Sequence, residues 1–188
     1  MCIAVCSAVR LAESSNLLNY SVFSTRLNSL AVCNENLYLL THQNLYELRV
    51  DLEDFDGGKG FAVYDGFSMG GEKENYMLKF LGPLKAGDAG DGLTYHASIP
   101  FSTIDIDNDR WEGGHCAVNH TGGWWYNQCE ASNLNGKYLN GLNPHEYQGV
   151  YWHEWHGPSY SLMSTKMMIR PKFREIPKTP TTTGTPLE

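Results

Sequence analysis

Three aspartates at alternate positions form the pattern in this sequence that points most directly to chemistry. Asp105, Asp107 and Asp109 are followed by Gly113 and Gly114, whose backbones are free to turn carbonyl groups toward a common point. Carboxylate and carbonyl oxygens are the ligands that Ca²⁺ prefers, and it takes about six to eight of them. An EF-hand beginning at Asp105 would need glycine and glutamate where the chain has arginine and cysteine, so that motif is excluded. The spacing alone leaves a calcium loop and a solvated acidic turn equally open.

Two cysteines bracket the segment that follows the acidic loop. A disulfide between Cys116 and Cys129 would stabilise the fold by about 3 kcal/mol in the chain-entropy model. The alternatives are two free buried thiols, or metal ligation together with His115 and His120. Zinc is disfavoured because the segment has no CxxC or HExxH spacing.

The region around and beyond these cysteines is rich in aromatic residues, which could stack on sugars or fill a core. We interpret most of them as packing mass, because a region with few strands and helices needs large side chains to fill its interior. His153, Glu154 and His156 could act as acids or bases, but we predict that they lie on extended chain without a nucleophile, and that the protein is not an enzyme. The aromatic set is Trp124, Trp125, Tyr126, Tyr138, Tyr147, Tyr151, Trp152, Trp155 and Tyr160.

The hydrophobic pattern predicts which elements position these residues. Apolar and charged residues alternate over 46–52, which is typical of a strand with one buried face. Residues 61–64 and 76–81 are predicted to form further strands, and glycine pairs between the segments favour tight turns. We therefore expect an antiparallel meander. Upstream of it, Asn34 can cap a short helix over 36–40.

The chain beyond this meander is predicted to be mostly loops. Residues 85–157 are dominated by Gly, Asn, Asp and aromatic residues, and regular structure returns only over 160–169. Binding residues are often carried by loops, so we expect any binding site in this region. The tail from Lys178, rich in Thr and Pro, has too little apolar surface to order itself.

Bulk properties exclude several classes of protein. A chain of 188 residues, 41% of them hydrophobic, is long enough for one core but short for two domains. A formal net charge of −7 argues against a nucleic-acid partner. No apolar run approaches the roughly 18 residues that span a bilayer, so membrane insertion is not expected. Residues 1–9 are apolar but lack preceding basic residues, which makes them a poor secretory signal. Sequons at Asn19 and Asn119 would matter only in a secreted chain.

Several motifs together identify a family. From residue 34 to about residue 173 the sequence resembles the fibrinogen C-terminal domain of fibrinogen chains, ficolins, tachylectins, angiopoietins and tenascins. The resemblance implies an α+β fold with an antiparallel sheet, short helices and a large loop-rich calcium and ligand subdomain. The matching stretches are NENLYLLT at 34–41, YELRVDL at 46–52, AGD at 89–91, FST at 101–103, DND at 107–109, GGWWY at 122–126, SNLNG at 132–136 and MIRP at 168–171.

The resemblance also assigns roles around the acidic loop. It implies Ca²⁺ held by the side chains of Asp107 and Asp109 and by the backbone carbonyls of Trp111 and Gly113. Asp105 is then expected to contact the ligand residues rather than the ion itself.

Further assignments concern the cysteines and the neighbouring pocket. The resemblance implies a Cys116–Cys129 disulfide and a cis peptide bond between Gln128 and Cys129. In lectin-type members an acetyl-binding pocket lies nearby, with a histidine after the second cysteine and a tyrosine four residues after the first. Here those positions hold Glu130 and His120, while Tyr147 can still form part of the wall. The ligand-contact residues expected in this chain are His120, Gln128, Glu130 and Tyr147.

The function implied is extracellular recognition of a glycan, acetylated in lectin-type members, or of a protein receptor. Asn119 is a candidate glycosylation site bordering that surface. Residues 1–33 do not resemble the family's N-terminal subdomain, and Cys2, Cys6 and Cys33 have no family partner. We therefore expect a leader of low order at 1–33, a partial domain at 34–173 and a disordered tail at 174–188. The alternative is a truncated structural or matrix fragment without an intact ligand pocket.

Overall fold

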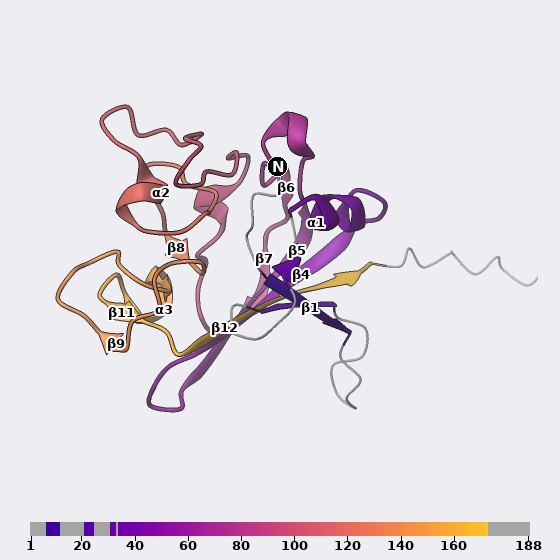
Figure 1. The fold of residues 1–188 in the computed structure, drawn as a ribbon. Helices are drawn as coiled ribbons and strands as arrows, with labels where there is room; N and C mark the ends of the chain where they lie inside the picture. Colours follow the sequence, from indigo (N-terminus) through magenta and orange to yellow (C-terminus); the bar gives the residue numbers. More distant parts are fainter. Residues whose placement is uncertain (1–6, 12–20, 25–30, 33, 173–188) are drawn as a thin grey trace, which may run out of the picture.

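The computed structural model describes residues 7–11, 21–24, 31–32 and 34–172. Figure 1 shows a long twisted sheet beside a lobe made mainly of loops, with α1 (Asn34–Thr41) near the sheet and α2 (Cys116–Asn119) and α3 (His153–His156) within the lobe. This arrangement confirms the predicted α+β class with an antiparallel sheet. None of the helices in these segments has the length and apolar content needed to cross a membrane.

The main sheet of the described residues has eight strands. Its order is β3-β1-β2-β12-β4-β5-β6, with β7 also pairing with β5, and the pairings are antiparallel. The strands are β1 (Ser7–Leu11), β2 (Ser21–Ser24), β3 (Ala31–Val32), β4 (Tyr46–Glu53), β5 (Lys59–Ser68), β6 (Phe80–Leu81), β7 (Leu84–Gly87) and β12 (Ser164–Pro171).

The lobe is built from short elements joined by long loops. Two small antiparallel pairs, β10 with β8 and β11 with β9, hold it together. The 3₁₀ turn η1 (Glu72–Glu74) lies between β5 and β6 in sequence, and the 3₁₀ turn η2 (Thr94–His96) follows β7. The lobe elements are α2 (Cys116–Asn119), β8 (Ser132–Asn133), β9 (Gly141–Leu142), β10 (Tyr151–Trp152), α3 (His153–His156) and β11 (Tyr160–Ser161).

Strand β4 shows why the alternating pattern forms a sheet with two different faces. Leu48, Val50 and Leu52 are at most 2% exposed, whereas Arg49 and Asp51 on the other face stay partly accessible. Successive side chains of a strand point to opposite faces, so the alternation places every apolar residue on one side. Each buried Leu or Val contributes about 1.5–3 kcal/mol relative to an exposed one.

The core continues from the sheet into the lobe. Trp124, Tyr126, Tyr151 and Trp152 are essentially fully buried, which confirms their interpretation as packing mass. Tyr138 and other aromatic residues at the edge of the lobe remain exposed. Large rings therefore replace regular structure as the filling of the lobe.

Two local predictions are wrong. Residues 76–81 were predicted as a strand, but only Phe80–Leu81 forms one, because Tyr76 has φ +48° and Leu78 bonds instead to the 98–99 turn. The segment from His153 to His156 is a single helical turn rather than extended chain, closed by the bond from the Gly157 N–H to the His153 carbonyl.

The described N-terminal strands extend the sheet beyond the boundary expected at Asn34. Strand β2 pairs with β12, with Ser21 opposite Ile169 and Ser24 opposite Lys166, and β1 lies next to β2. The predictions for Cys2, Cys6, Cys33, Asn19 and the tail 174–188 lie outside the described residues.

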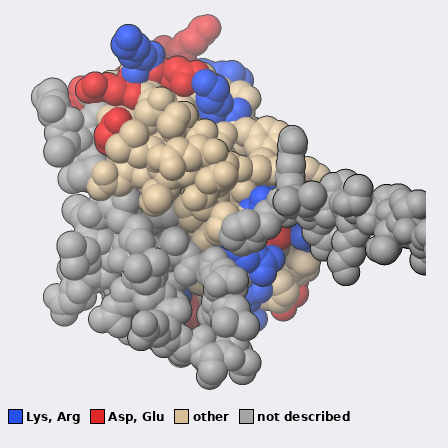
Figure 2. Space-filling model, turned by 90° about the vertical axis from the view of Figure 1, so that its right-hand side faces the viewer, with Lys and Arg blue, Asp and Glu red and all other residues tan. Residues whose placement is uncertain are grey.

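Several charged side chains on the surface of the described residues form pairs of opposite sign. Lys79 contacts Glu74 at 2.7 Å, and Lys172 contacts Asp65 at 2.6 Å. Figure 2 shows acidic and basic side chains next to one another along the upper margin of one face, with uncharged residues between them and a second charged group. The charge on this face is therefore mixed rather than gathered into a patch of one sign.

Candidate functional site

The acidic loop brings two of its predicted ligands together. The carboxylates of Asp107 and Asp109 and the ring of His115 offer atoms that all lie within 4.8 Å of one another. Asp109 accepts backbone N–H bonds from Trp111 and Cys116, both at 2.8 Å, and Asp107 accepts the Asp109 N–H at 3.1 Å. A carboxylate has about four lone-pair sites, so these bonds orient the oxygens and leave capacity for a cation.

The asparagine of the loop, like Asp109, ties the loop to the core. The Asn108 side chain donates to the Phe101 carbonyl at 2.7 Å, and the Asn108 N–H donates to the Ser102 hydroxyl at 3.0 Å. Asp105 is exposed and accepts the Thr103 hydroxyl at 2.7 Å. Asp105 therefore helps to shape the turn that precedes Asp107.

The two cysteines form the expected bond. Cys116 and Cys129 are joined by a disulfide with a Cα–Cα distance of 5.6 Å, which excludes the free-thiol and zinc alternatives for this pair. The Gln128–Cys129 peptide is cis, as the resemblance implied. The Cys116 N–H also donates to Asp109, so a hydrogen bond connects the disulfide directly to the acidic loop. Gln128 itself is exposed, and its carbonyl accepts the Tyr95 hydroxyl at 3.2 Å.

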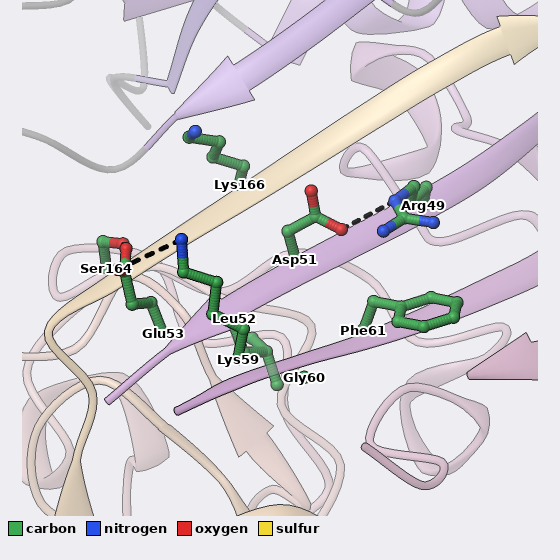
Figure 3. Close-up of a pocket in the computed structure, with 9 residues that line it drawn as sticks. All are labelled: Arg49, Asp51, Leu52, Glu53, Lys59, Gly60, Phe61, Ser164 and Lys166. Atoms are coloured by element: carbon green, nitrogen blue, oxygen red, sulfur yellow. Dashed lines mark hydrogen bonds and ion pairs between the residues drawn. The ribbon is translucent and has the colours of Figure 1, made fainter. Parts of the chain in front are cut away.

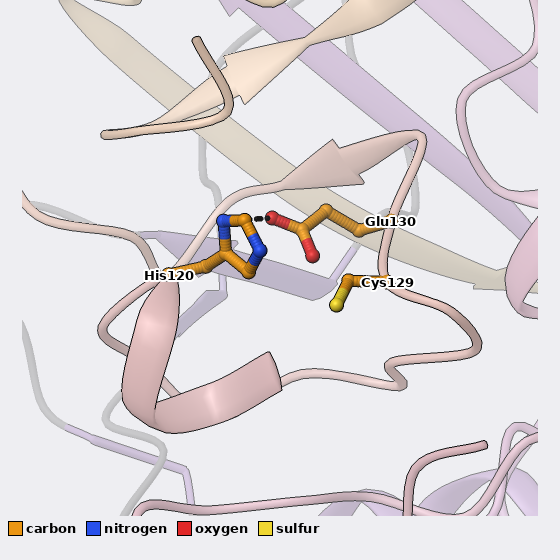
Figure 4. A group of neighbouring side chains, drawn as sticks. All are labelled: His120, Cys129 and Glu130. Atoms are coloured by element: carbon orange, nitrogen blue, oxygen red, sulfur yellow. Dashed lines mark ion pairs between the residues drawn. The ribbon is translucent and has the colours of Figure 1, made fainter. Parts of the chain in front are cut away.

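Glu130, directly after the disulfide, carries a buried carboxyl group. Its side chain is 0% exposed, and neither oxygen makes a hydrogen bond to the described residues, although His120 Nδ1 lies 3.1 Å from Oε1. Figure 4 shows the two side chains facing each other above Cys129. Burial, together with the negative charge of Asp109, raises the pKa of the Glu130 carboxyl to about 8. At neutral pH this group is therefore mostly protonated.

The same histidine ties the disulfide loop to the loop that carries Tyr147. His120 Nδ1 donates to the Tyr147 carbonyl at 2.7 Å, and Gln148 donates to the Asn119 carbonyl at 3.1 Å. Tyr147 has φ +58° and is 37% exposed, and its ring stacks on His153 with 6.4 Å between centroids. Three of the four expected ligand-contact residues, His120, Glu130 and Tyr147, are thus brought together.

Comparisons with known proteins decide the family. The family model described as "Fibrinogen beta and gamma chains, C-terminal globular domain" matches residues 20–172. The chain belongs to the fibrinogen C-terminal domain family. The matched range begins before Asn34 and includes β2.

Relatives within this fibrinogen family are similar over most of the chain. Human "Angiopoietin-related protein 6" is 48% identical over 139 residues, covering 73% of this chain and 29% of that protein. "Fibrinogen C domain-containing protein 1-B" of Xenopus laevis is 42% identical over 146 residues, covering 75% and 31%. The chain thus spans about three tenths of the length of these curated relatives.

Solved fibrinogen-like domains share the fold. The fibrinogen-like globe domain of human ANGPTL2 aligns with a TM-score of 0.75 and 36% identity, covering 88% of this chain and 92% of that one. The lamprey fibrin D-dimer, complexed with the peptide ligand Gly-His-Arg-Pro-amide, aligns with a TM-score of 0.72 and 32% identity, covering 88% and 59%.

One functional residue of this fibrinogen domain was missed by the sequence reasoning. His96 is fully buried; its Nδ1 lies 2.7 Å from the Trp125 carbonyl, and its Nε2 accepts N–H bonds from Ala131 and Ser132 at 3.2 and 3.3 Å. Burial lowers the pKa of His96 to about 4, so the ring is neutral with its proton on Nδ1. It holds the chain just after Glu130 in place. A single histidine in a polar segment gave no signal of this role.

Proposed function

We propose that this fibrinogen C-terminal domain is a calcium-stabilised extracellular recognition module that binds a protein partner through its loop-rich lobe. The observation that carries the proposal is the exposed side chain of Tyr147, which lies at φ +58° and whose backbone carbonyl accepts from His120. A non-glycine residue in this conformation costs roughly 1–3 kcal/mol, and such residues cluster at binding sites. Tyrosine offers a large contact area for little conformational entropy, which suits a protein interface.

Calcium is the metal that the acidic loop fits. The side chains of Asp107 and Asp109 would hold it together with the carbonyls of Trp111 and Gly113, an all-oxygen set of the kind calcium prefers. His115 is near, but its Nε2 contacts the Thr103 carbonyl at 3.0 Å, and nitrogen is a poor calcium ligand. A bound Ca²⁺ would supply positive charge between the two carboxylates. Binding only to the folded chain, it would also stabilise the domain.

The choice of partner follows from a solved relative and from the residues at the lobe site. The peptide bound to the lamprey relative supports a peptide or protein partner for this chain. Lectin-type members place histidine and tyrosine at the positions of Glu130 and His120, so an acetylated glycan is the second candidate. The disulfide supports an extracellular location, because such bonds persist in oxidising compartments.

A binding experiment with defined probes tests the proposal. Gly-His-Arg-Pro-amide and an array of acetylated glycans are each presented to the chain in calcium and in EDTA. We expect saturable, calcium-dependent peptide binding that is lost in Tyr147→Ala. Phe80→Ala is the matched control, because Phe80 is an exposed aromatic residue on β6, outside the lobe.

Three other results would change the conclusion. Retention of acetylated glycans alone would establish the lectin alternative. Peptide binding that Tyr147→Ala does not alter would place the contact elsewhere. A chain that binds neither probe and unfolds without cooperativity would support the structural-fragment alternative.

A further inference from the structure

A second concave site lies on the main sheet. It is a pocket of about 190 Å³ formed by polar side chains of β4, β5 and the start of β12. Figure 3 shows these side chains standing on the three neighbouring strands. The volume is below the roughly 300–1,000 Å³ of sites for drug-sized ligands, so the pocket suits a ligand of about one sugar ring. Its polar members are Arg49, Asp51, Glu53, Lys59, Ser164 and Lys166.

The pocket is separate from the lobe site. Its polar β4 residues, Arg49, Asp51 and Glu53, alternate with the buried Leu48 and Leu52, of which Leu52 also borders the pocket. Alternate residues of a strand face opposite sides of the sheet, so the pocket opens on the face turned away from the core. A ligand here would not contact the acidic loop or the Tyr147 loop.

The lining carries a positive charge on an acidic protein. Three cationic side chains surround the pocket against two carboxylates, whereas the whole chain has a formal net charge of −7. Each carboxylate has partners within the pocket, since Arg49 Nε donates to one oxygen of Asp51 at 2.6 Å, and Glu53 accepts from Ser164 at 3.0 Å and pairs with Lys59 at 3.6 Å. Lys166 lies across from Asp51 in the β12–β4 register, is exposed, and makes no ion pair with the part of the chain that the structure describes.

The free groups of the pocket are of two kinds. The guanidinium of Arg49 lies 4.2 Å from the Phe61 ring centroid, and its Nε bond to Asp51 fixes its plane, which leaves both terminal nitrogens without a bond to the described residues. Lys166, on the neighbouring strand β12, is a second cationic donor of the lining. The second oxygen of Asp51 is an acceptor that likewise makes no hydrogen bond to the described residues. Cationic donors recognise a carboxylate, which Arg can bind with two parallel bonds, and a free carboxylate oxygen accepts from a hydroxyl.

We propose that this sheet-face pocket binds a carboxylate-bearing sugar of the uronic acid class. The sugar carboxylate lies between the Arg49 terminal nitrogens and the Lys166 ammonium, and a ring hydroxyl donates to Asp51. The requirement for both kinds of group separates this ligand from a simple anion, which has no hydroxyl to donate to the Asp51 carboxylate. The proposal does not depend on the function proposed for the lobe.

The test titrates the full chain with sodium glucuronate while NMR records the backbone amides. EDTA is present so that a metal ion cannot recruit the carboxylate, and sodium chloride keeps the ionic strength constant. We expect saturable shifts over β4, β5 and β12 with a Kd on the order of 1 mM. Glucose lacks the carboxylate and acetate lacks the hydroxyls, so each is expected to bind at least about tenfold more weakly. Methyl glucuronide, which presents the acid as a residue of a chain, separates a glycan-linked ligand from a free sugar acid.

Substitutions complete the test. Lys166→Gln should weaken glucuronate about tenfold and leave the thermal unfolding midpoint unchanged, because Lys166 is exposed. Lys79→Gln is the matched control, since Lys79 pairs with Glu74 outside the pocket. This variant should bind glucuronate with the affinity of the unsubstituted chain. Arg49→Gln should also weaken binding, but Lys166→Gln remains decisive if that variant folds poorly. Shifts outside the three strands, an affinity equal to that for acetate, or an unchanged Lys166→Gln would each overturn the proposal.

Discussion

Replacing the buried Glu130 carboxyl by an amide of the same shape should stabilise the protein at neutral pH. The folded-state pKa of Glu130 is raised from 4.5 to about 8, mainly by burial. The unfolded chain loses this proton above its ordinary pKa while the folded chain keeps it. Stability from this group is therefore complete below about pH 4.5 and falls as the pH rises toward 8. At about 1.36 kcal/mol per pKa unit, the loss reaches about 3 kcal/mol at pH 7 and about 4 kcal/mol at pH 8, where the folded-state group is half titrated.

Urea unfolding of wild type and Glu130→Gln at pH 4, 5, 6, 7 and 8 in EDTA measures this difference. EDTA is needed because a cation at Asp109 would lower the Glu130 pKa. We expect the two proteins to be equally stable at pH 4 and the variant to gain up to about 3 kcal/mol at pH 7. Glu72→Gln, at an exposed position, is the control without a pH-dependent gain. A constant stability difference from pH 4 to pH 8, or a variant less stable at pH 7, would refute the reasoning.

Three further predictions follow from other parts of the lobe. The unfolded-state pKa of His96 is about 6.5 and its folded-state pKa is about 4. The free energy of unfolding should therefore fall by about 3 kcal/mol as the pH drops from 6.5 to 4. In urea titrations, His96→Gln should reduce this dependence on pH. Serine at both Cys116 and Cys129 should lower the free energy of unfolding by about 3 kcal/mol and weaken calcium binding, since the Cys116 N–H orients Asp109; calorimetry checks both effects. Asn119 is exposed at the end of α2 and should carry a glycan when the chain is secreted from animal cells, seen as a mass loss with a glycosidase and absent in Asn119→Gln.

The sheet could be predicted where its pattern is local. Strand β4 alternates apolar and charged residues over its whole length, so its buried face can be predicted without knowing which strands pair with it. The segment 76–81 has a similar apolar content, but the left-handed Tyr76 and the bonds of Leu78 to the 98–99 turn decide its conformation. Those contacts depend on residues about twenty positions away, which no local pattern contains.

The candidate site also has a part that the sequence predicts and a part that it does not. The acidic loop and the disulfide were predictable because the family motif places Asp107, Asp109 and both cysteines at fixed positions. The burial of Glu130 was not, since an acidic residue in a polar loop is usually exposed. Here Tyr126 and Tyr151, which approach from separate segments, are both fully buried and help to bury its carboxyl group.

Calcium titration of Asp107→Asn against wild type tests the central claim most directly. Asp107 is exposed and accepts only one backbone bond among the described residues, so its replacement should leave the metal-free fold intact. Wild type should bind Ca²⁺ in calorimetry, and saturation at about 100 times Kd should add about 2.7 kcal/mol to the free energy of unfolding, reversed by EDTA. Asp107→Asn should lose both effects, while Asp105→Asn should keep both. Equal unfolding of wild type in calcium and in EDTA, or calcium binding by Asp107→Asn at the wild-type affinity, would contradict a calcium-stabilised recognition module.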